Sequence, residues 1–191
     1  MAFKPPVAVY DSCVLYPFEV RNLLVQFAFD RLVEPRWTDE IHDEWIRNLV
    51  ANTPGLTRSR LEQTRDLMKQ AVPSADVTGY QQHVPTITLP DPDDRHVVAA
   101  GIAGGASIIV TWNLKDFPAI ELSRHGLKAQ SPDALARRLY TADPTLVVAS
   151  VKRARANLQK SKPSAAQYLH ILGQRNLAGF AAALQKHLRQ I

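Results

Sequence analysis

The sequence predicts an α/β protein: a parallel sheet covered by helices on both faces as a three-layer α/β/α sandwich, followed by an all-helical C-terminal extension. Short β-branched runs alternate with stretches of helical spacing as far as about residue 130, and this alternation is typical of parallel sheets. Beyond that point the apolar spacing is helical throughout, with N-cap and proline pairs at 131–132 and 143–144. We therefore expect two domains, 1–130 and 131–191.

Five short apolar runs are expected to form strands. The first, Val7–Tyr10, ends directly before Asp11, and the run at 106–111 is the most strongly apolar. The other three cover residues 35–37, 84–89 and 126–130. Connecting helices are expected at 18–31, 38–50, 59–71 and about 93–104, where apolar residues recur every three to four positions.

The bulk composition fits a globular protein with a single cysteine. A length of 191 residues with 46% hydrophobic residues allows a sizeable core. The one cysteine, Cys13, rules out an intramolecular disulfide and any Cys-rich zinc site, so we expect a cytoplasmic location. We find no signal-peptide pattern, and glycines interrupt the longest uncharged run, 97–114. No association with a membrane is expected.

The charge is divided unevenly along the chain. Residues 1–123 hold 11 Lys and Arg against 16 Asp and Glu, whereas residues 124–191 hold 12 against 2. So basic a segment attracts RNA or DNA, or docks on an acidic protein surface. The alternative is that the helical tail has solvated faces and packs on the α/β domain as structure. Its apolar face would then consist of Leu158, Tyr168, Leu169, Leu172 and Phe180.

Acidic and amide side chains are expected to meet at one edge of the sheet, because functional groups gather at the carboxyl ends of parallel strands. Asp11 follows the first strand, and Asn113 and Asp116 follow the strongest one. A helix adds Glu40 and Glu44, which are four residues apart and so share a face. Two carboxylates about 4 Å apart repel by about 4 kcal/mol at an effective dielectric constant near 20. Such a cluster calls for a cation.

The segment that begins PDPDD adds Asp91, Asp93 and Asp94, and local sequence supports two interpretations of it. Asp91 followed by Pro92 is a good helix start, with the next two acids favourable at the positive end of the helix dipole. Alternatively, one of the three acids holds a metal. Oxygen ligands without Cys or paired His favour Mg²⁺ or Mn²⁺, and these ions suit hydrolysis of phosphodiesters.

Three stretches of the sequence together resemble the PIN-domain ribonucleases, in particular the VapC-like toxins of bacterial toxin–antitoxin pairs. They read VYDSCVLYP, WTDEIHDEWIRNL and LPDPDDRHVVAAGIAGGASIIVTWNLKDFP, and the match covers about residues 7–130. The resemblance implies a parallel α/β/α sandwich with Mg²⁺- or Mn²⁺-dependent endonuclease activity on single-stranded RNA. It also implies a small antitoxin partner; a homodimer is a further assembly that we consider.

Carried over residue by residue, the resemblance assigns the metal-binding and catalytic acids to Asp11, Glu44, Asp94 and Asp116. Asn113, Thr111 and Ser12 are expected to support them, with the Thr111 hydroxyl orienting a neighbouring carboxylate; the Ser12 hydroxyl either binds a ligand or phosphate or caps a turn. Asp91 is then the helix cap, Asp93 a solvated acid and Glu40 a weaker candidate ligand. Two departures stand out: Asn113 is neutral where many relatives have Asp, and Cys13 stands where Asn is frequent, so we expect its side chain to be dispensable.

Basic residues are weaker candidates for contacts with RNA. Arg21 and His96 lie near the site in sequence, although a surface ion pair and a satisfied histidine in the first turn are competing interpretations. Lys152, Arg153 and Arg155 are the candidates in the tail. A second function class stays open: a non-catalytic nucleic-acid-binding or regulatory protein that acts through its basic tail, with acids that only cap helices.

Overall fold

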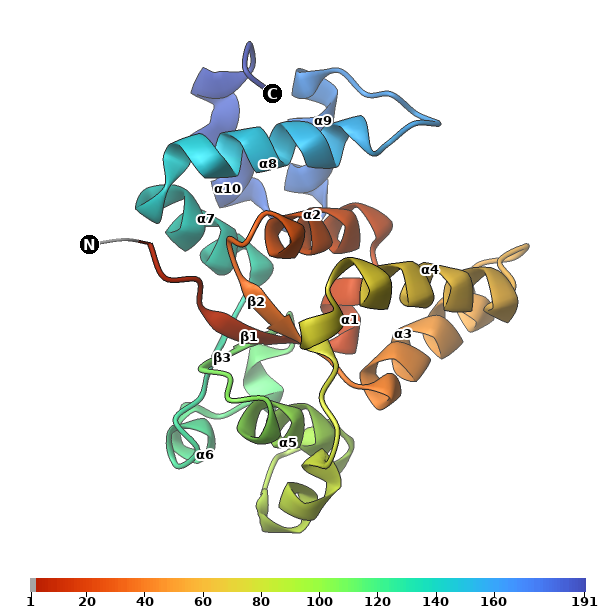
Figure 1. Ribbon diagram of the computed structural model, residues 1–191, viewed down its shortest axis with the longest axis vertical. Coiled ribbons are helices and arrows are strands. Elements are labelled where there is room, and N and C mark those ends of the chain that lie inside the picture. The colour runs from red at the N-terminus through yellow and green to blue at the C-terminus, as the bar shows by residue number, and fades with distance from the viewer. Residues whose placement is uncertain (1–2) are drawn as a thin grey trace.

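The computed structural model describes residues 3–191, with a four-stranded parallel sheet at its centre (Figure 1). The strands are β1 (Val7–Tyr10), β2 (Glu34–Arg36), β3 (Ile108–Val110) and β4 (Lys128–Gln130). Their order across the sheet is β2-β1-β3-β4. In the register of the sheet, Val9 lies beside Arg36 on one side and Ile109 on the other. The predicted parallel α/β architecture is confirmed.

Ten α-helices surround the sheet in the described chain, and shorter 3₁₀ helices connect them. The first five are α1 (Ser12–Leu15), α2 (Phe18–Phe29), α3 (Asp39–Asn52), α4 (Arg58–Ala71) and α5 (Arg95–Ala103). The others are α6 (Ala119–Ser123), α7 (Pro132–Ala142), α8 (Pro144–Ala156), α9 (Ala165–Gln174) and α10 (Ala178–Leu184). None of the helices within residues 3–191 is long and apolar enough to cross a membrane.

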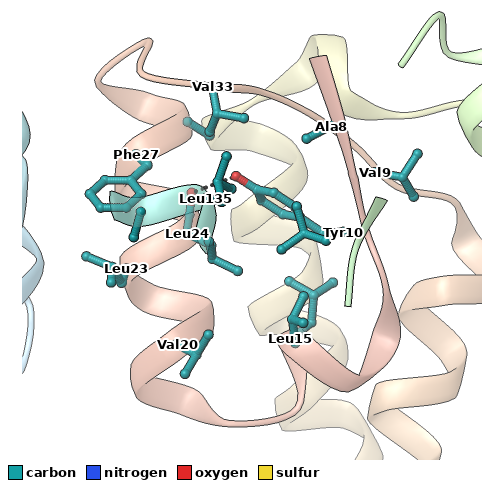
Figure 2. Packing of buried hydrophobic residues seen from close by; sticks show 14 of the residues in the cluster. Ala8, Val9, Tyr10, Leu15, Val20, Leu23, Leu24, Phe27, Val33 and Leu135 are labelled. Atoms are coloured by element: carbon teal, nitrogen blue, oxygen red, sulfur yellow. Dashed lines mark hydrogen bonds between the residues drawn. The ribbon is translucent and has the colours of Figure 1, made fainter. Parts of the chain in front are cut away.

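The central strands are buried because helices cover the sheet on two sides. Figure 1 shows α2 and the C-terminal helices on one side, and α5 and α6 on the other. Every residue of β3 is fully buried, which explains why this strand reads as a continuous apolar run. Figure 2 shows Tyr10 of β1 beside Leu24 of α2 and Leu135 of α7. The Tyr10 hydroxyl donates a hydrogen bond to the Leu24 carbonyl over 3.4 Å.

The C-terminal helices share their core with the α/β part. The five apolar residues expected on one face of the tail are all buried, and they belong to the same hydrophobic cluster as the strands. Phe180 of α10 meets Phe27 of α2 edge to face, with ring centroids 6.1 Å apart. The Asn22 side chain of α2 also donates to the Ala154 carbonyl of α8 over 2.7 Å. The tail is therefore part of the packed structure.

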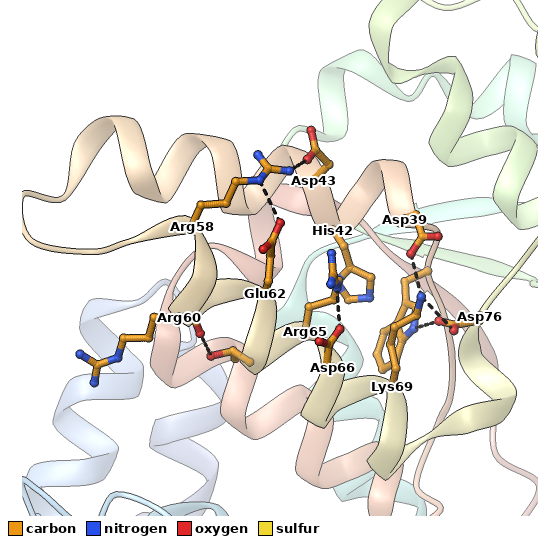
Figure 3. A network of polar contacts seen from close by, with 12 residues as sticks. Asp39, His42, Asp43, Arg58, Arg60, Glu62, Arg65, Asp66, Lys69 and Asp76 are labelled. Atoms are coloured by element: carbon orange, nitrogen blue, oxygen red, sulfur yellow. Dashed lines mark hydrogen bonds and ion pairs between the residues drawn. The ribbon is translucent and has the colours of Figure 1, made fainter.

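Helices α3 and α4 form an antiparallel pair joined by charged side chains (Figure 3). Lys69 of α4 lies 2.7 Å from a carboxylate oxygen of Asp39 and 3.2 Å from one of Asp76. Arg58 pairs with Asp43 of α3 and, over 2.9 Å, with Glu62. Exposed pairs of this kind each add little stability. The Lys69–Asp39 and Arg58–Asp43 pairs connect α4 to α3, the helix that carries Glu44.

The strand expected at residues 84–89 is wrong. The chain there forms a 3₁₀ helix over Tyr80–Thr86, which begins after Gly79 in the left-handed conformation (φ 71°). Pro85 lies inside this turn and has no N–H to donate to a neighbouring strand. Ile87 and Leu89 are nevertheless buried. The apolar pattern thus reported burial correctly, but the buried residues pack without joining the sheet.

Candidate active site

The ends of the strands bring the first expected site residues together. The backbone N–H of Asp11 donates to the Val110 carbonyl at the end of β3 over 3.1 Å. Similarly, the N–H of Thr111 donates to the Gln130 carbonyl at the end of β4 over 3.1 Å. The ladder therefore continues one residue beyond the strands, and it places Asp11 and Thr111 side by side at the carboxyl edge of the sheet.

The carboxylate of Asp11 is held by two side chains. Asp11 is 2% exposed, and its Oδ2 accepts hydrogen bonds from the Thr111 hydroxyl (2.6 Å) and the Cys13 thiol (3.1 Å). Burial raises the pKa of Asp11, and the two hydrogen bonds oppose that rise. The Thr111 oxygen also accepts from the Asn113 N–H over 3.0 Å. Thr111 thus orients the carboxylate, the role that its position in the sequence suggested.

Glu44 reaches the same edge from α3. Thr38 caps this helix by accepting a hydrogen bond from the Ile41 N–H over 3.1 Å. Burial acts to raise the pKa of the half-buried Glu44, but hydrogen bonds from His96 and Ser12 outweigh it and hold the pKa below its usual value. The His96 Nε2 lies 3.5 Å from a Glu44 oxygen. Glu44 therefore stays ionised.

The acids of the PDPDD segment take different positions. Asp91 caps the 3₁₀ helix Pro92–Asp94, because its Oδ1 accepts from the Asp93 N–H over 2.9 Å. The expected cap is therefore confirmed. Asp93 is exposed, whereas Asp94 is half-buried. Burial, followed by repulsion from Asp11, Asp91, Glu44 and Asp116, raises the pKa of Asp94 to about 7. Asp94 thus lies at the centre of the acidic cluster.

An open cavity of about 470 Å³ lies over this cluster. Its lining consists of Glu40, Asp43, Glu44, Arg47, Asp91, Asp93, Asp94, His96, Asn113 and Asp116. Asp11, Thr111 and Ser12 are buried and are not part of the lining. The cavity thus receives acids from α3, from the turn before α5 and from the turn after β3. Asp11 still acts electrostatically on Asp94, so all four expected acids belong to one charged neighbourhood.

The donors around the cavity fit a hard divalent cation in type and in charge. They are carboxylate and amide oxygens, which Mg²⁺ and Mn²⁺ prefer. Burial and repulsion among these acids raise the pKa of Asp94, so a cation bound beside it would be favourable. Within residues 3–191 no three His, Cys, Asp or Glu side chains already converge as a complete metal site. Side chains at the rim would therefore have to turn toward an ion.

Three residues near the cluster were not expected in their observed places. Cys13 was expected to be dispensable, yet its thiol touches Asp11 and accepts a hydrogen bond from the Trp112 N–H over 3.3 Å. His96 bridges two acids of α3, since its Nδ1 also lies 3.9 Å from a Glu40 oxygen. Arg47 lines the cavity. Its spacing, three residues after Glu44 on a helix, is a signal that the sequence did contain.

Arg21 is wrong as a contact with RNA. It is 6% exposed, and its guanidinium donates to the carbonyls of Leu15 and Tyr16. The guanidinium carbon also lies 4.6 Å from the centre of the Trp45 ring. Arg21 is therefore a structural side chain that links α1, α2 and α3.

The basic residues expected in the tail are largely engaged within the protein. Arg153 pairs with Asp30 over 3.0 Å, and Arg155 donates to the carbonyls of Ile191 (2.9 Å) and Pro163 (2.7 Å). Asp30 follows α2 and lies at the end of that helix away from the strand ends that carry Asp11. Arg153 and Arg155 thus have partners within the protein, Lys152 is exposed without a partner in the described chain, and the contact of all three with RNA stays a prediction.

Comparison with known proteins agrees with this architecture. The family model of the PIN domain matches residues 8–115, more than half of the chain. The model of the VapC50 C-terminal domain matches residues 132–186, and the boundary expected near residue 130 falls between the two. Neither the curated proteins nor the solved structures that were searched gave a match. The chain belongs to the PIN domain family and, through its C-terminal helices, is a VapC-like member of it.

Proposed function

We propose that the protein is a Mg²⁺- or Mn²⁺-dependent endoribonuclease that hydrolyses single-stranded RNA as the toxin of a toxin–antitoxin pair. Its two domain matches assign it to a family of ribonuclease toxins. The dependence on a metal, the single-stranded RNA substrate and the roles of single residues are our proposals. We further propose that it acts in the cytoplasm, where a small antitoxin protein restrains it and where it can form a homodimer.

One observation carries this proposal: seven Asp and Glu side chains, Asp94 among them, line one cavity, and Arg47 is the only Lys or Arg in that lining. Acids from separate segments repel one another across the cavity, and the pKa of Asp94 is raised to about 7 as a result of burial and this repulsion. Such a cluster lowers the stability of the fold, and clusters of this kind occur at sites that bind a ligand. A divalent cation is the ligand that would relieve the repulsion.

In this proposal Asp11, Glu44, Asp94 and Asp116 hold the metal, and Asn113, Thr111 and Ser12 support them. Thr111 keeps the Asp11 carboxylate in one direction, and Ser12 with His96 keeps Glu44 ionised. The bound ion would polarise a phosphoryl oxygen and lower the pKa of the attacking water. Water attacks phosphorus, the bond to the 3′ oxygen breaks, and that oxygen takes up a proton. The products carry 5′-phosphate and 3′-hydroxyl ends.

Cleavage of a labelled single-stranded RNA tests the proposal. We expect the wild type to cleave the RNA with Mn²⁺ and not with EDTA. For Asp11→Asn and Asp94→Asn we expect the cleavage rate to fall by about a hundredfold or more, as is typical when a group that stabilises the transition state is removed. Asp66→Asn is the matched control, because Asp66 is an exposed acid of α4 outside the cavity. Cleavage that persists in EDTA, or full activity of Asp94→Asn, would overturn the proposal.

The non-catalytic alternative receives no support from the tail. Two of its candidate cations, Arg153 and Arg155, have partners within the protein, namely Asp30 and backbone carbonyls. The tail also supplies core residues such as Phe180. These observations explain the helical extension without assigning it a nucleic-acid-binding role.

The antitoxin part of the proposal is tested in cells. Expression of the chain should arrest growth, and co-expression of a small protein encoded beside it should relieve the arrest. If the protein cleaves RNA with Mn²⁺ in vitro but its expression does not arrest growth, the nuclease proposal stands and the toxin proposal is overturned.

A further inference from the structure

Arg47 is placed differently from every other basic residue near the acidic cavity. It follows Glu44 by three residues and Glu40 by seven, so the three side chains lie along one face of α3. All three line the cavity. Among the lining residues Arg47 is the only Lys or Arg, and seven of the other nine are Asp or Glu.

The guanidinium of Arg47 has no partner within residues 3–191. Its natural partner on the helix is Asp43, four residues earlier, but Asp43 is already paired with Arg58 of α4. Two further cations of the α3–α4 pair are similarly engaged, Arg65 with Asp66 and Lys69 with Asp39 (Figure 3), whereas Arg60 does not line the cavity. The charged network thus binds the neighbouring cations and leaves Arg47 exposed at the rim of the cavity.

A free guanidinium beside an acidic cavity is suited to an anion that the acids alone would repel. Arg offers a planar fork of donors that matches the oxygens of a phosphate, whereas a carboxylate cavity offers only acceptors. An RNA strand has a phosphate at every nucleotide, so a strand with one phosphodiester over the acids presents its next phosphate near the rim. Arg47 is the cation available at that rim.

We infer that Arg47 binds a phosphate of the RNA strand adjacent to the phosphodiester that is cleaved, and thereby sets the position of the strand across the cavity. This inference rests on the proposed function. Arg47 is then a binding residue and not one that touches the reacting atoms. Its loss should weaken the engagement of RNA much more than it slows the chemical step.

Steady-state cleavage of a labelled single-stranded RNA with Mn²⁺ tests the inference on the full chain. Three variants are compared with the wild type: Arg47→Ala, Arg47→Lys and the control Arg60→Ala. Arg60 is also an exposed arginine of the α3–α4 pair, but it does not line the acidic cavity, and Figure 3 shows it pointing away from Asp43 and Glu62. Both alanine variants therefore lose one positive charge from exposed helix positions.

For Arg47→Ala we expect KM to rise about tenfold while kcat changes less than about threefold, because one charge-assisted phosphate contact is lost. The log–log dependence of KM on salt should flatten by about 0.7, the contribution of one phosphate of a single strand. Arg47→Lys should restore the salt slope but only part of KM, since the charge remains and the fork is lost. Arg60→Ala should match the wild type. Unchanged thermal melting would show that all variants are folded.

The outcomes separate this inference from the proposed function. If the wild type does not cleave RNA with Mn²⁺, the nuclease proposal fails before the variants are compared. If the wild type cleaves and Arg47→Ala keeps both its KM and its salt slope, the inference is overturned and the nuclease proposal stands. A fall in kcat at constant KM, or an equal effect of Arg60→Ala, would likewise overturn the binding role of Arg47.

Discussion

The half-buried carboxylate of Asp94 links the charge of the cavity to the stability of the fold. Its pKa is about 7 in the folded protein against 3.8 for the free group. Between these pH values the folded state binds more protons than the unfolded state. The free energy of unfolding is therefore not reduced by Asp94 below about pH 4, and it falls as the pH rises from there through about 7, where Asp94 ionises in the folded protein. Metal-free wild type should therefore lose stability relative to Asp94→Asn as the pH rises from 5 to 8.

Thermal unfolding of both proteins in EDTA measures this difference, and Asp66→Asn controls for the removal of an exposed charge. Adding Mn²⁺ at pH 8 should raise the melting temperature of the wild type and leave Asp94→Asn nearly unchanged. A constant difference between wild type and Asp94→Asn across the pH range would show that folding does not raise the pKa of Asp94.

Asp91 should matter for stability and not for chemistry. Asp91→Ala removes the oxygen that accepts from the Asp93 N–H and should lower the free energy of unfolding by about 0.5–2 kcal/mol. Asp91→Asn keeps a capping oxygen and should lose little. Chemical denaturation measures both, and the rate of RNA cleavage by the folded variants should stay within a few-fold of the wild type. Loss of cleavage with unchanged stability would mean that Asp91, and not Asp94, binds the metal.

Single residues of the site were predictable where a local rule governed them. Asp91 before Pro92 is a local capping signal, and the cap is present. Arg21 is the opposite case: its sequence position on an amphipathic helix does not reveal that two carbonyls and the Trp45 ring enclose it. The contact between the Cys13 thiol and the Thr111 hydroxyl was likewise not predictable, because the two residues are 98 positions apart; that the Cys13 side chain is not needed for catalysis stays a prediction.

At the level of whole elements, the sequence predicted most of the sheet. Val7–Tyr10 was assigned within its observed bounds, the runs at 106–111 and 126–130 each contain an observed strand, and the run at 35–37 overlaps β2, which begins one residue earlier. The run at 84–89 failed because hydrophobicity reports burial and not the partner that provides it. Ile87 and Leu89 are buried, but the edge of the sheet that would pair with them is not beside them. Pairing is a long-range property that periodicity does not contain.

Glu121 of α6 joins two of the segments that carry acids. It is 7% exposed, and its carboxylate accepts from the Thr88 N–H (3.3 Å) and from the Arg124 side chain (2.7 Å). Thr88 lies three residues before Asp91. Glu121→Ala leaves the Thr88 N–H without its acceptor and should cost about 1–3 kcal/mol.

Urea denaturation of Glu121→Ala and Glu121→Gln measures this cost. The glutamine keeps an acceptor oxygen, so it should recover more than half of the lost stability. Hydrogen exchange should be faster in the segment around Thr88 for the alanine variant. Equal stability of the two variants would show that the hydrogen bond to Thr88 contributes nothing.

For the whole molecule, the main consequence is that the α/β part and the tail have one core. Phe180 is fully buried against Phe27, so Phe180→Ala should cost about 3–5 kcal/mol although it lies outside the acidic cavity. Calorimetry should show one cooperative transition at a lower temperature, with KM for RNA unchanged below it. If the α/β part were stable alone, calorimetry would show two transitions. Phe180→Ala would then shift the transition of the tail and leave the transition of the α/β part, at higher temperature, unchanged.

The edge-to-face contact of Phe27 with Phe180 also bears on when a nascent chain completes its fold and could acquire the activity that we propose. The acids of the cavity are all translated by residue 116, and α8 can cover part of α2 earlier, but Phe27 lacks its contact with Phe180 until α10 has left the ribosome. Domains generally fold as units during synthesis, so release before α10 should give a more protease-sensitive fragment. Proteolysis of ribosome-bound chains of increasing length would detect this step: full protection should arise only once residue 184 has emerged.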